Sequence, residues 1–297
     1  MTRRTAGVLI GLNLVALAGL VGFHVAAPPE PPTLAPQGSR AVLGALVGQV
    51  EVRRQGTKVW SVAQIGVLLE EGDEVRTGLF SEASLLLKGA SEVTVDPNSS
   101  FVVGREKDLA SAFELAEGRI TADLARQGER EYLFYSRGSD AVATGKAGEF
   151  SVATDGKGTV VVDALEGEVK LVAKGGEVLV PKGRRSIVLP DAQPAPVLPI
   201  PSSVALQVRW PAAKTDKTSV RLEGSTVAGA VVMVNGLMVR ADGAGSFQVD
   251  VPLREGPNKL VVNATDNAGN AALKESPTIL VDTKPPALDV DAKGLWK

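Results

Sequence analysis

The sequence contains no cysteine, and its single histidine is His24. The chain after residue 24 therefore has no thiol or imidazole for a Cys–His nucleophile pair, a Ser-His-Asp triad, a zinc site or a dithiol redox centre. An enzyme would have to use carboxylates, Lys or Tyr alone, and the carboxylates of Glu71 and Asp73 are too close together in one predicted turn to flank a cleft. We expect a protein that is not an enzyme and that carries no metal or other cofactor.

Aromatic residues are also scarce, at 4% of the 297 residues. Sites that bind proteins or sugars rely on aromatic side chains, so the few that occur together matter. The densest group is Tyr132, Phe134 and Tyr135. In a strand, Tyr132 and Phe134 would share one face, and Leu133 and Tyr135 would share the other. We predict that one of these faces is exposed and we take the three aromatic residues as candidates for contact with a partner.

No charge of one sign dominates the chain, since 32 Lys and Arg stand against 34 Asp and Glu. This balance gives no electrostatic case for nucleic acid as a partner. One small basic group stands out, formed by Lys182, Arg184 and Arg185. It is predicted to be a turn that could meet an acidic partner or a phosphate group, and a solvated charge run is the alternative.

The chain has one long hydrophobic run, from Ala6 to Ala27, with Arg3 and Arg4 ahead of it. At about 22 residues, the run is long enough to cross a bilayer as a helix. The arginines place the amino terminus in the cytoplasm by the positive-inside rule. A cleaved signal peptide is the alternative, because the run ends in small residues typical of a cleavage site. We expect a single-pass anchor in the inner membrane of a Gram-negative bacterium, with the bulk of the chain in the periplasm.

Proline-rich stretches divide the chain, because proline fixes φ and removes an amide donor, which favours extended spacers. The sequence predicts an anchor or uncleaved signal at 1–27, a Pro-rich spacer at 28–40, a first domain at 41–189, a Pro-rich linker at 190–202, a second domain at 203–283 and a tail at 284–297.

Strands are predicted throughout the first domain, where apolar and polar residues alternate in short runs. The stretch from Glu106 to Arg126 has a composition that favours a helix. Its apolar residues nevertheless follow a period of two around Gly118, and this period indicates a strand.

Several phrases of the first domain resemble the extracytoplasmic domain of the FecR family. They include Gly48-Gln49-Val50-Glu51-Val52, Gly72-Asp73-Glu74-Val75-Arg76-Thr77-Gly78 and Ala164-Leu165-Glu166-Gly167-Glu168-Val169, and the resemblance runs from about Ala45 to Val188. It implies a module that receives a signal in the envelope, which family regulators pass to a sigma factor through a cytoplasmic domain. Only about five residues precede the hydrophobic run, so we expect the outer interaction module without that domain. Within the second phrase, Asp73 is predicted to be a turn residue.

The second domain has the strand spacing of a small β-sandwich. Asn235-Gly236 lies between two apolar runs and predicts a hairpin with a type I′ turn. The turns that follow resemble those of bacterial Ig-like domains over about Thr218 to Asp282. Asp266, Asn267 and Asn270 are read as a turn, with a calcium site as the less favoured alternative.

Together these patterns predict an all-β protein with an N-terminal transmembrane helix, a FecR-like β domain and an Ig-like β-sandwich. The leading functional hypothesis is a non-enzymatic, membrane-anchored periplasmic module that binds another envelope protein or scaffolds an assembly, with a role in envelope signalling. The alternative is a module that binds peptidoglycan or another envelope polysaccharide.

Overall fold

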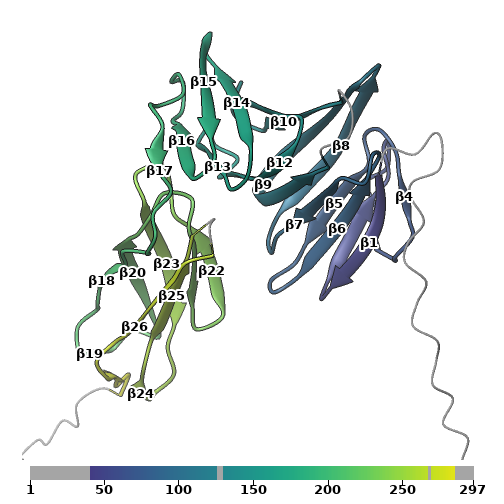
Figure 1. The fold of residues 1–297 in the computed structure, drawn as a ribbon. Coiled ribbons are helices and arrows are strands. Elements are labelled where there is room, and N and C mark those ends of the chain that lie inside the picture. The colour runs from purple at the N-terminus through teal and green to yellow at the C-terminus, as the bar shows by residue number, and fades with distance from the viewer. Residues whose placement is uncertain (1–40, 126–129, 267–268, 285–297) are drawn as a thin grey trace, which may run out of the picture. The chain divides into compact units, whose positions relative to one another are not determined.

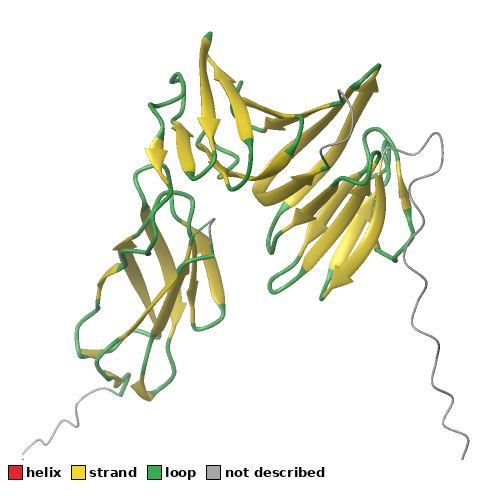
Figure 2. Ribbon diagram, in the orientation of Figure 1, coloured by secondary structure: helices red, strands yellow, loops and turns green. Residues whose placement is uncertain are grey.

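The computed structural model describes residues 41–125, 130–266 and 269–284. Every regular element in these ranges is a β-strand, as Figure 2 shows. The prediction of an all-β protein is confirmed for these residues. No helix able to cross a membrane occurs among them, and the predicted N-terminal anchor lies outside them.

The strands fall into two bodies, which are described separately. The first body contains β1 (Ala41–Val47), β2 (Val50–Arg53), β3 (Trp60–Val62), β4 (Leu68–Leu69), β5 (Glu74–Thr77), β6 (Glu82–Leu87), β7 (Glu92–Val95), β8 (Ser100–Lys107), β9 (Ala110–Leu124), β10 (Glu131–Ser136), β11 (Val142–Gly145), β12 (Gly148–Thr154), β13 (Val160–Ala164), β14 (Glu168–Ala173), β15 (Gly176–Pro181), β16 (Arg184–Val188) and β17 (Leu198–Pro199).

These strands form two sheets that enclose one hydrophobic core (Figure 1). Sheet A has the order β4-β1-β6-β7-β9-β12-β13-β16-β17. Sheet B has the order β3-β2-β5-β8-β9-β10-β11-β14-β15. All neighbours are antiparallel except β9 and β10, which are parallel.

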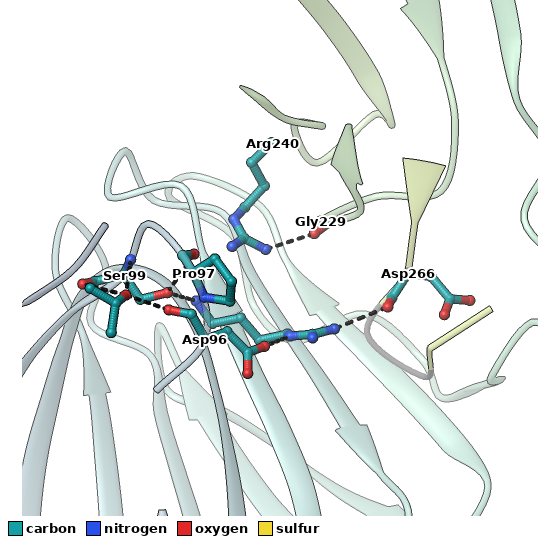
Figure 3. Close-up of polar contacts among 8 residues, drawn as sticks. Asp96, Pro97, Ser99, Gly229, Arg240 and Asp266 are labelled. Carbon is teal, nitrogen blue, oxygen red and sulfur yellow. Dashed lines mark hydrogen bonds and ion pairs between the residues drawn. The ribbon is translucent and has the colours of Figure 1, made fainter. Parts of the chain in front are cut away.

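Strand β9 belongs to both sheets, which explains its length of 15 residues. Its first part pairs with β8 and β10 in sheet B, and its second part pairs with β7 and β12 in sheet A. The crossing point is Gly118, which has φ +99° and lies against Ser99, so that a Cβ at this position would stand 2.1 Å from the Ser99 hydroxyl oxygen. Ser99 in turn donates to the carbonyl of Pro97 (Figure 3). The strand predicted within Glu106 to Arg126 is confirmed, and Gly118 is its corner.

Four phenylalanines run through the core of the first body. Phe101, Phe113, Phe134 and Phe150 follow one another with ring centroids 5.3, 5.5 and 5.5 Å apart. Such pairs stabilise a core beyond the area that they bury. They come from β8, β9, β10 and β12, so the column joins both sheets.

The proline-rich linker is attached to the first body. Strand β17 pairs with β16, and the amide of Ala195 donates to the carbonyl of Ile187 at 2.8 Å. The Ser186 hydroxyl donates to the carbonyl of Ala195, and Val197 packs against the core. The linker is extended, and it adds the edge strand β17 to sheet A.

The second body contains β18 (Gln207–Arg209), β19 (Lys214–Thr215), β20 (Ser219–Ser225), β21 (Val231–Val234), β22 (Leu237–Arg240), β23 (Ser246–Pro252), β24 (Gly256–Asn258), β25 (Val261–Thr265), β26 (Ala271–Glu275) and β27 (Ile279–Val281). They form the sheets β18-β20-β23, β19-β27-β24 and β22-β21-β25-β26 around a second core.

The predicted hairpin at Asn235-Gly236 is confirmed. Val234 lies opposite Leu237, and both turn residues have positive φ, at +47° and +89°. This is the combination that a type I′ turn needs. Near the other end of the hairpin, Arg240 donates to the carbonyl of Gly229 at 3.0 Å, which fixes the start of β21 (Figure 3).

Candidate interaction surface

Strand β10 divides the aromatic group between the two faces of sheet B. Tyr132 and Phe134 point into the core, where Phe134 is 0% exposed and the Tyr132 hydroxyl donates to the carbonyl of Lys88 at 2.6 Å. Tyr135 points the other way and is 42% exposed. The predicted alternation is confirmed, and Tyr135 remains a candidate for partner contact. Tyr132 and Phe134 do not, because their side chains are buried in the fold.

An apolar patch surrounds Tyr135 on the outward face of sheet B. Tyr135 lies opposite Val142, which lies opposite Val172. The next row joins Leu133 through Thr144 and Lys170 to Leu179, which is 52% exposed. We call this patch the Tyr135 face, defined by Leu133, Tyr135, Val142, Val172 and Leu179.

Two ion pairs border the Tyr135 face, and a third reaches into it, because Lys170 lies between Leu133 and Leu179. They join Arg137 to Glu114 at 2.7 Å, Lys146 to Glu131 at 3.1 Å and Lys170 to Glu177 at 2.7 Å. Each pair is exposed, so each adds little to the stability of the fold. An apolar surface whose few charged residues are paired with one another is compatible with a protein interface.

A shallow cavity of about 440 Å³ lies at the margin of this face. Thr144, Lys170 and Leu179 line it from the strands, and Gly148 and Gly167 form its far side. The backbone is close-packed at that side, because a Cβ on Gly148 would stand 2.3 Å from the carbonyl oxygen of Glu166. The cavity offers a partner side chain a recess beside the Tyr135 face.

Sequence reasoning identified Tyr135 but missed Val142, Val172 and Leu179. Their alternation with buried neighbours was readable, and it places each of them on one face of its strand. The pairing that brings the three strands beside Tyr135 connects segments distant in sequence, and nothing local signals it.

The three residues of the predicted basic turn lie in different environments, because β16 begins at Arg184. Lys182 is exposed and pairs with Glu166, and Arg184 is exposed. Arg185 is buried and makes two hydrogen bonds to Asp163 on β13, at 2.6 and 2.7 Å. The prediction that Arg185 is open to a partner is wrong, because strand alternation turns it toward a buried carboxylate that requires a counter-charge.

The phrase from Gly72 to Gly78 has a structural role. The buried Asp73 carboxylate accepts hydrogen bonds from the amides of Gln55 and Glu70, at 2.9 and 3.1 Å, and from the Arg54 guanidinium at 2.5 Å. It thereby ties the β2–β3 turn to the β4–β5 turn. Thr77 is buried as well and accepts from the amide of Ser99 at 3.0 Å. The prediction of Asp73 as a turn residue is confirmed, and its bonds extend beyond its own turn.

Residues 73–170 match the model of the FecR protein family. They are a FecR domain. This match agrees with the resemblance seen in the sequence, and the matched residues include β10 and β11, whereas Val172 on β14 and Leu179 on β15 follow them. The Ig-like resemblance of the second body stays a prediction.

Two crystal structures of a candidate anti-sigma factor from Parabacteroides distasonis are similar to the chain at 13% and 15% identity, each with a TM-score of 0.37. They cover 42% of this chain and 57% of their own. A polysaccharide lyase aligns with 80% of this chain and 40% of its own, at 11% identity and a TM-score of 0.21. The chain thus spans less than two thirds of either protein, and neither likeness supports a functional argument. No curated protein has significant similarity to the chain.

Within the described part of the FecR domain and the second body, no three His, Cys, Asp or Glu residues gather as metal ligands. At the alternative calcium position, the Asn270 side-chain amide donates to Asp266 and to the carbonyl of Pro201, both at 2.9 Å. Those bonds stabilise a turn. Asn267 lies outside the described residues.

Trp60, on the edge of sheet B, is held by two guanidinium groups. Arg53 and Arg76 lie 4.9 and 4.0 Å from the ring centroid. Cation–π contacts of this kind occupy ring surface that a sugar would need for stacking. Trp60 is therefore placed as a structural edge residue, and the Tyr135 face is the better candidate for recognition.

Proposed function

We propose that this chain is a membrane-anchored periplasmic protein that binds another envelope protein through the Tyr135 face, has no enzymatic activity and takes part in envelope signalling. The FecR domain at residues 73–170 supports the signalling part of this proposal. The hydrophobic run from Ala6 to Ala27 supports the anchor and the periplasmic location.

The observation that carries the proposal is the Tyr135 face itself. Five outward side chains on adjacent strands form an apolar surface in a protein with few aromatic residues. Their charged neighbours are already paired, so a partner can cover the face without leaving an unpaired charge buried. Enzymatic activity is disfavoured, because the chain after residue 27 contains no cysteine and no histidine.

A double substitution tests this function. Tyr135→Ser with Leu179→Ser removes the two most exposed apolar groups of the face, and we expect at least a tenfold loss of the envelope protein that copurifies with the full chain after crosslinking. Leu109→Ser with Leu273→Ser is the matched control, since both residues are exposed elsewhere. Equal loss in the two variants, or no loss in either, would reject the face as the binding site.

A polar groove in the second body favours the polysaccharide alternative. It has a volume of about 560 Å³ and is lined by Gln207 on β18, Glu223 on β20 and Gln248 on β23, among others. Amide and carboxylate groups on one sheet face suit sugar hydroxyls. Cosedimentation of the full chain with purified peptidoglycan sacculi, compared with a Gln207→Ala and Gln248→Ala variant, tests this second candidate.

A further inference from the structure

The two edges of sheet B are built differently. The β15 edge carries Glu177, Pro181 and the following Lys182. The linker residue Gln193 also lies against Gly176 and donates to the carbonyl of Lys174. Charges, proline and a covering segment are the usual protection of a sheet edge against pairing with other chains.

Strand β3 itself contains no charged residue and no proline, and Lys58 precedes it. Trp60, Ser61 and Val62 pair with β2 on one side, and no strand of the described chain pairs with the other. The amide of Ala63 donates to Val50 at 2.9 Å, and Ser61 lies opposite Val52. Because bonding residues alternate along an antiparallel pair, the N–H and C=O groups of Trp60 and Val62 point away from β2. A strand laid beside β3 would find them free.

Large apolar side chains are exposed at the same edge and in the segment that follows it. Val59 is 70% exposed, Val62 81%, Ile65 62% and Leu68 42%. Val59 and Val62 flank Trp60 and Ser61 on the edge, Ile65 lies in the connection that follows, and Leu68 lies on β4 of sheet A. Single exposed apolar residues are common, but exposed apolar residues that gather at an unpaired edge mark a binding or aggregation surface.

The edge is also held rigid and carries a spare positive charge. The β2–β3 turn is fixed by Asp73, and Trp60 is held by Arg53 and Arg76. Nearby arginines are paired with acids, whereas Lys58 is exposed and has no acidic partner among the described residues. A preorganised edge loses little entropy when a partner binds.

We propose that β3 binds an extended segment of another protein by strand addition, and that this segment alternates apolar and polar residues and places an acidic residue beside Lys58. Main-chain bonds to Trp60 and Val62 would provide affinity, and contacts with Val59, Val62 and Ile65 would select the apolar pattern. This surface is separate from the Tyr135 face, so either can fail without the other.

Register-specific crosslinking in the full chain tests the proposal. The probe is a synthetic ten-residue peptide of alternating valine and threonine that begins with aspartate, with a single cysteine moved along it. Because the chain has no cysteine, Val62→Cys and Ser61→Cys supply unique partners. We expect disulfide yields that alternate along the peptide with a period of two and with opposite phase for the two positions.

Equal yields along the peptide would overturn strand addition, as would equal yields with a peptide whose valines are grouped. Failure of the peptide to bind would also overturn it. Disulfide-linked dimers of the Val62→Cys chain that exclude the peptide would assign the edge to a second copy instead. Glu177→Cys, on the protected β15 edge, is the matched control and should give no alternation.

A proline substitution separates the backbone role from the side chain. Val62→Pro removes an outward N–H that makes no bond to β2, so the fold should persist while peptide affinity falls at least tenfold. Val62→Thr keeps the amide and the branched shape and should bind within threefold of the natural chain. Lys58→Glu should weaken the peptide about threefold, and should not weaken a version that begins with asparagine. If Val62→Pro keeps its melting temperature and still binds, strand addition is wrong.

Discussion

The inner and outer faces of sheet B contrast most clearly on strand β10. Phe134 and Tyr135 are neighbours in sequence, yet Phe134 is enclosed by other phenylalanines and Tyr135 is open to solvent. A single step along a strand exchanges a residue that stabilises the fold for one that is available to a partner. Two aromatic residues can therefore have different roles, and the face of the strand on which each one lies decides which role it has.

The same contrast applies to charged residues. Arg184 and Arg185 are also neighbours, and only Arg185 reaches the buried carboxylate of Asp163. Charges on the outer face form exposed pairs around the Tyr135 face. We expect inner residues to determine stability and outer residues to determine binding.

The largest effect is expected at the phenylalanine column. Phe134→Ala should lower the free energy of unfolding by about 4 kcal/mol, because it leaves a cavity between Phe113 and Phe150. Tyr135→Ala should cost about 1 kcal/mol or less. Urea denaturation of both variants measures the difference, and equal losses would break the contrast between the two faces.

The buried ion pair is expected to come next. Arg185→Met should cost about 3 kcal/mol, because the carboxylate of Asp163 stays buried without its partner. Arg184→Met is the control and should change stability by about 0.5 kcal/mol or less. Adding Asp163→Leu to Arg185→Met should restore much of the loss. A double variant less stable than Arg185→Met alone would contradict this explanation.

A smaller loss is expected at the buried turn. Asp73→Ala should cost about 2 kcal/mol, because it leaves the amides of Gln55 and Glu70 without their acceptor. Glu70→Ala changes an exposed side chain in the same turn and should be nearly neutral. The midpoint of thermal unfolding measures both, and a neutral Asp73→Ala would show that the phrase is not architectural.

The smallest effect is a pH dependence at Glu106. Burial opposes its ionisation, but the hydrogen bond and charge of Lys88 and the charge of Arg130 outweigh burial, so the pKa of Glu106 is lowered. Its contribution is present above the ordinary carboxyl pKa and is lost as the pH falls through the lowered value. Glu106→Gln should therefore cost about 0.5 kcal/mol at pH 7, and this cost should disappear as the pH falls through the lowered pKa of Glu106. Glu168→Gln is the control, and a cost independent of pH would contradict the assignment.

Much of the fold was predictable, because alternation is a local signal. It identified strand β9 against its helical composition and the faces of β10, and the Asn235-Gly236 turn, another local signal, identified the hairpin. The corner at Gly118 was not predictable, since it depends on the close approach of Ser99 from another strand.

The candidate site was predictable only in part. Alternation shows which residues share a face, but it does not show whether that face is covered. Tyr135 could be found because aromatic residues are rare, whereas Leu179 became visible only once β14 joined β15 to β11. The free edge of β3 likewise depends on which strands pair with one another, and no local residue pattern predicts it.

Photocrosslinking from the outer face tests the central claim most directly. A benzophenone amino acid in place of Tyr135, in the full chain in intact cells, should yield one discrete crosslinked protein of the envelope, and that product should disappear when Leu179→Asp is added. The same group in place of Leu273 should yield only background. Indistinguishable products from the two positions would contradict a binding role for the Tyr135 face.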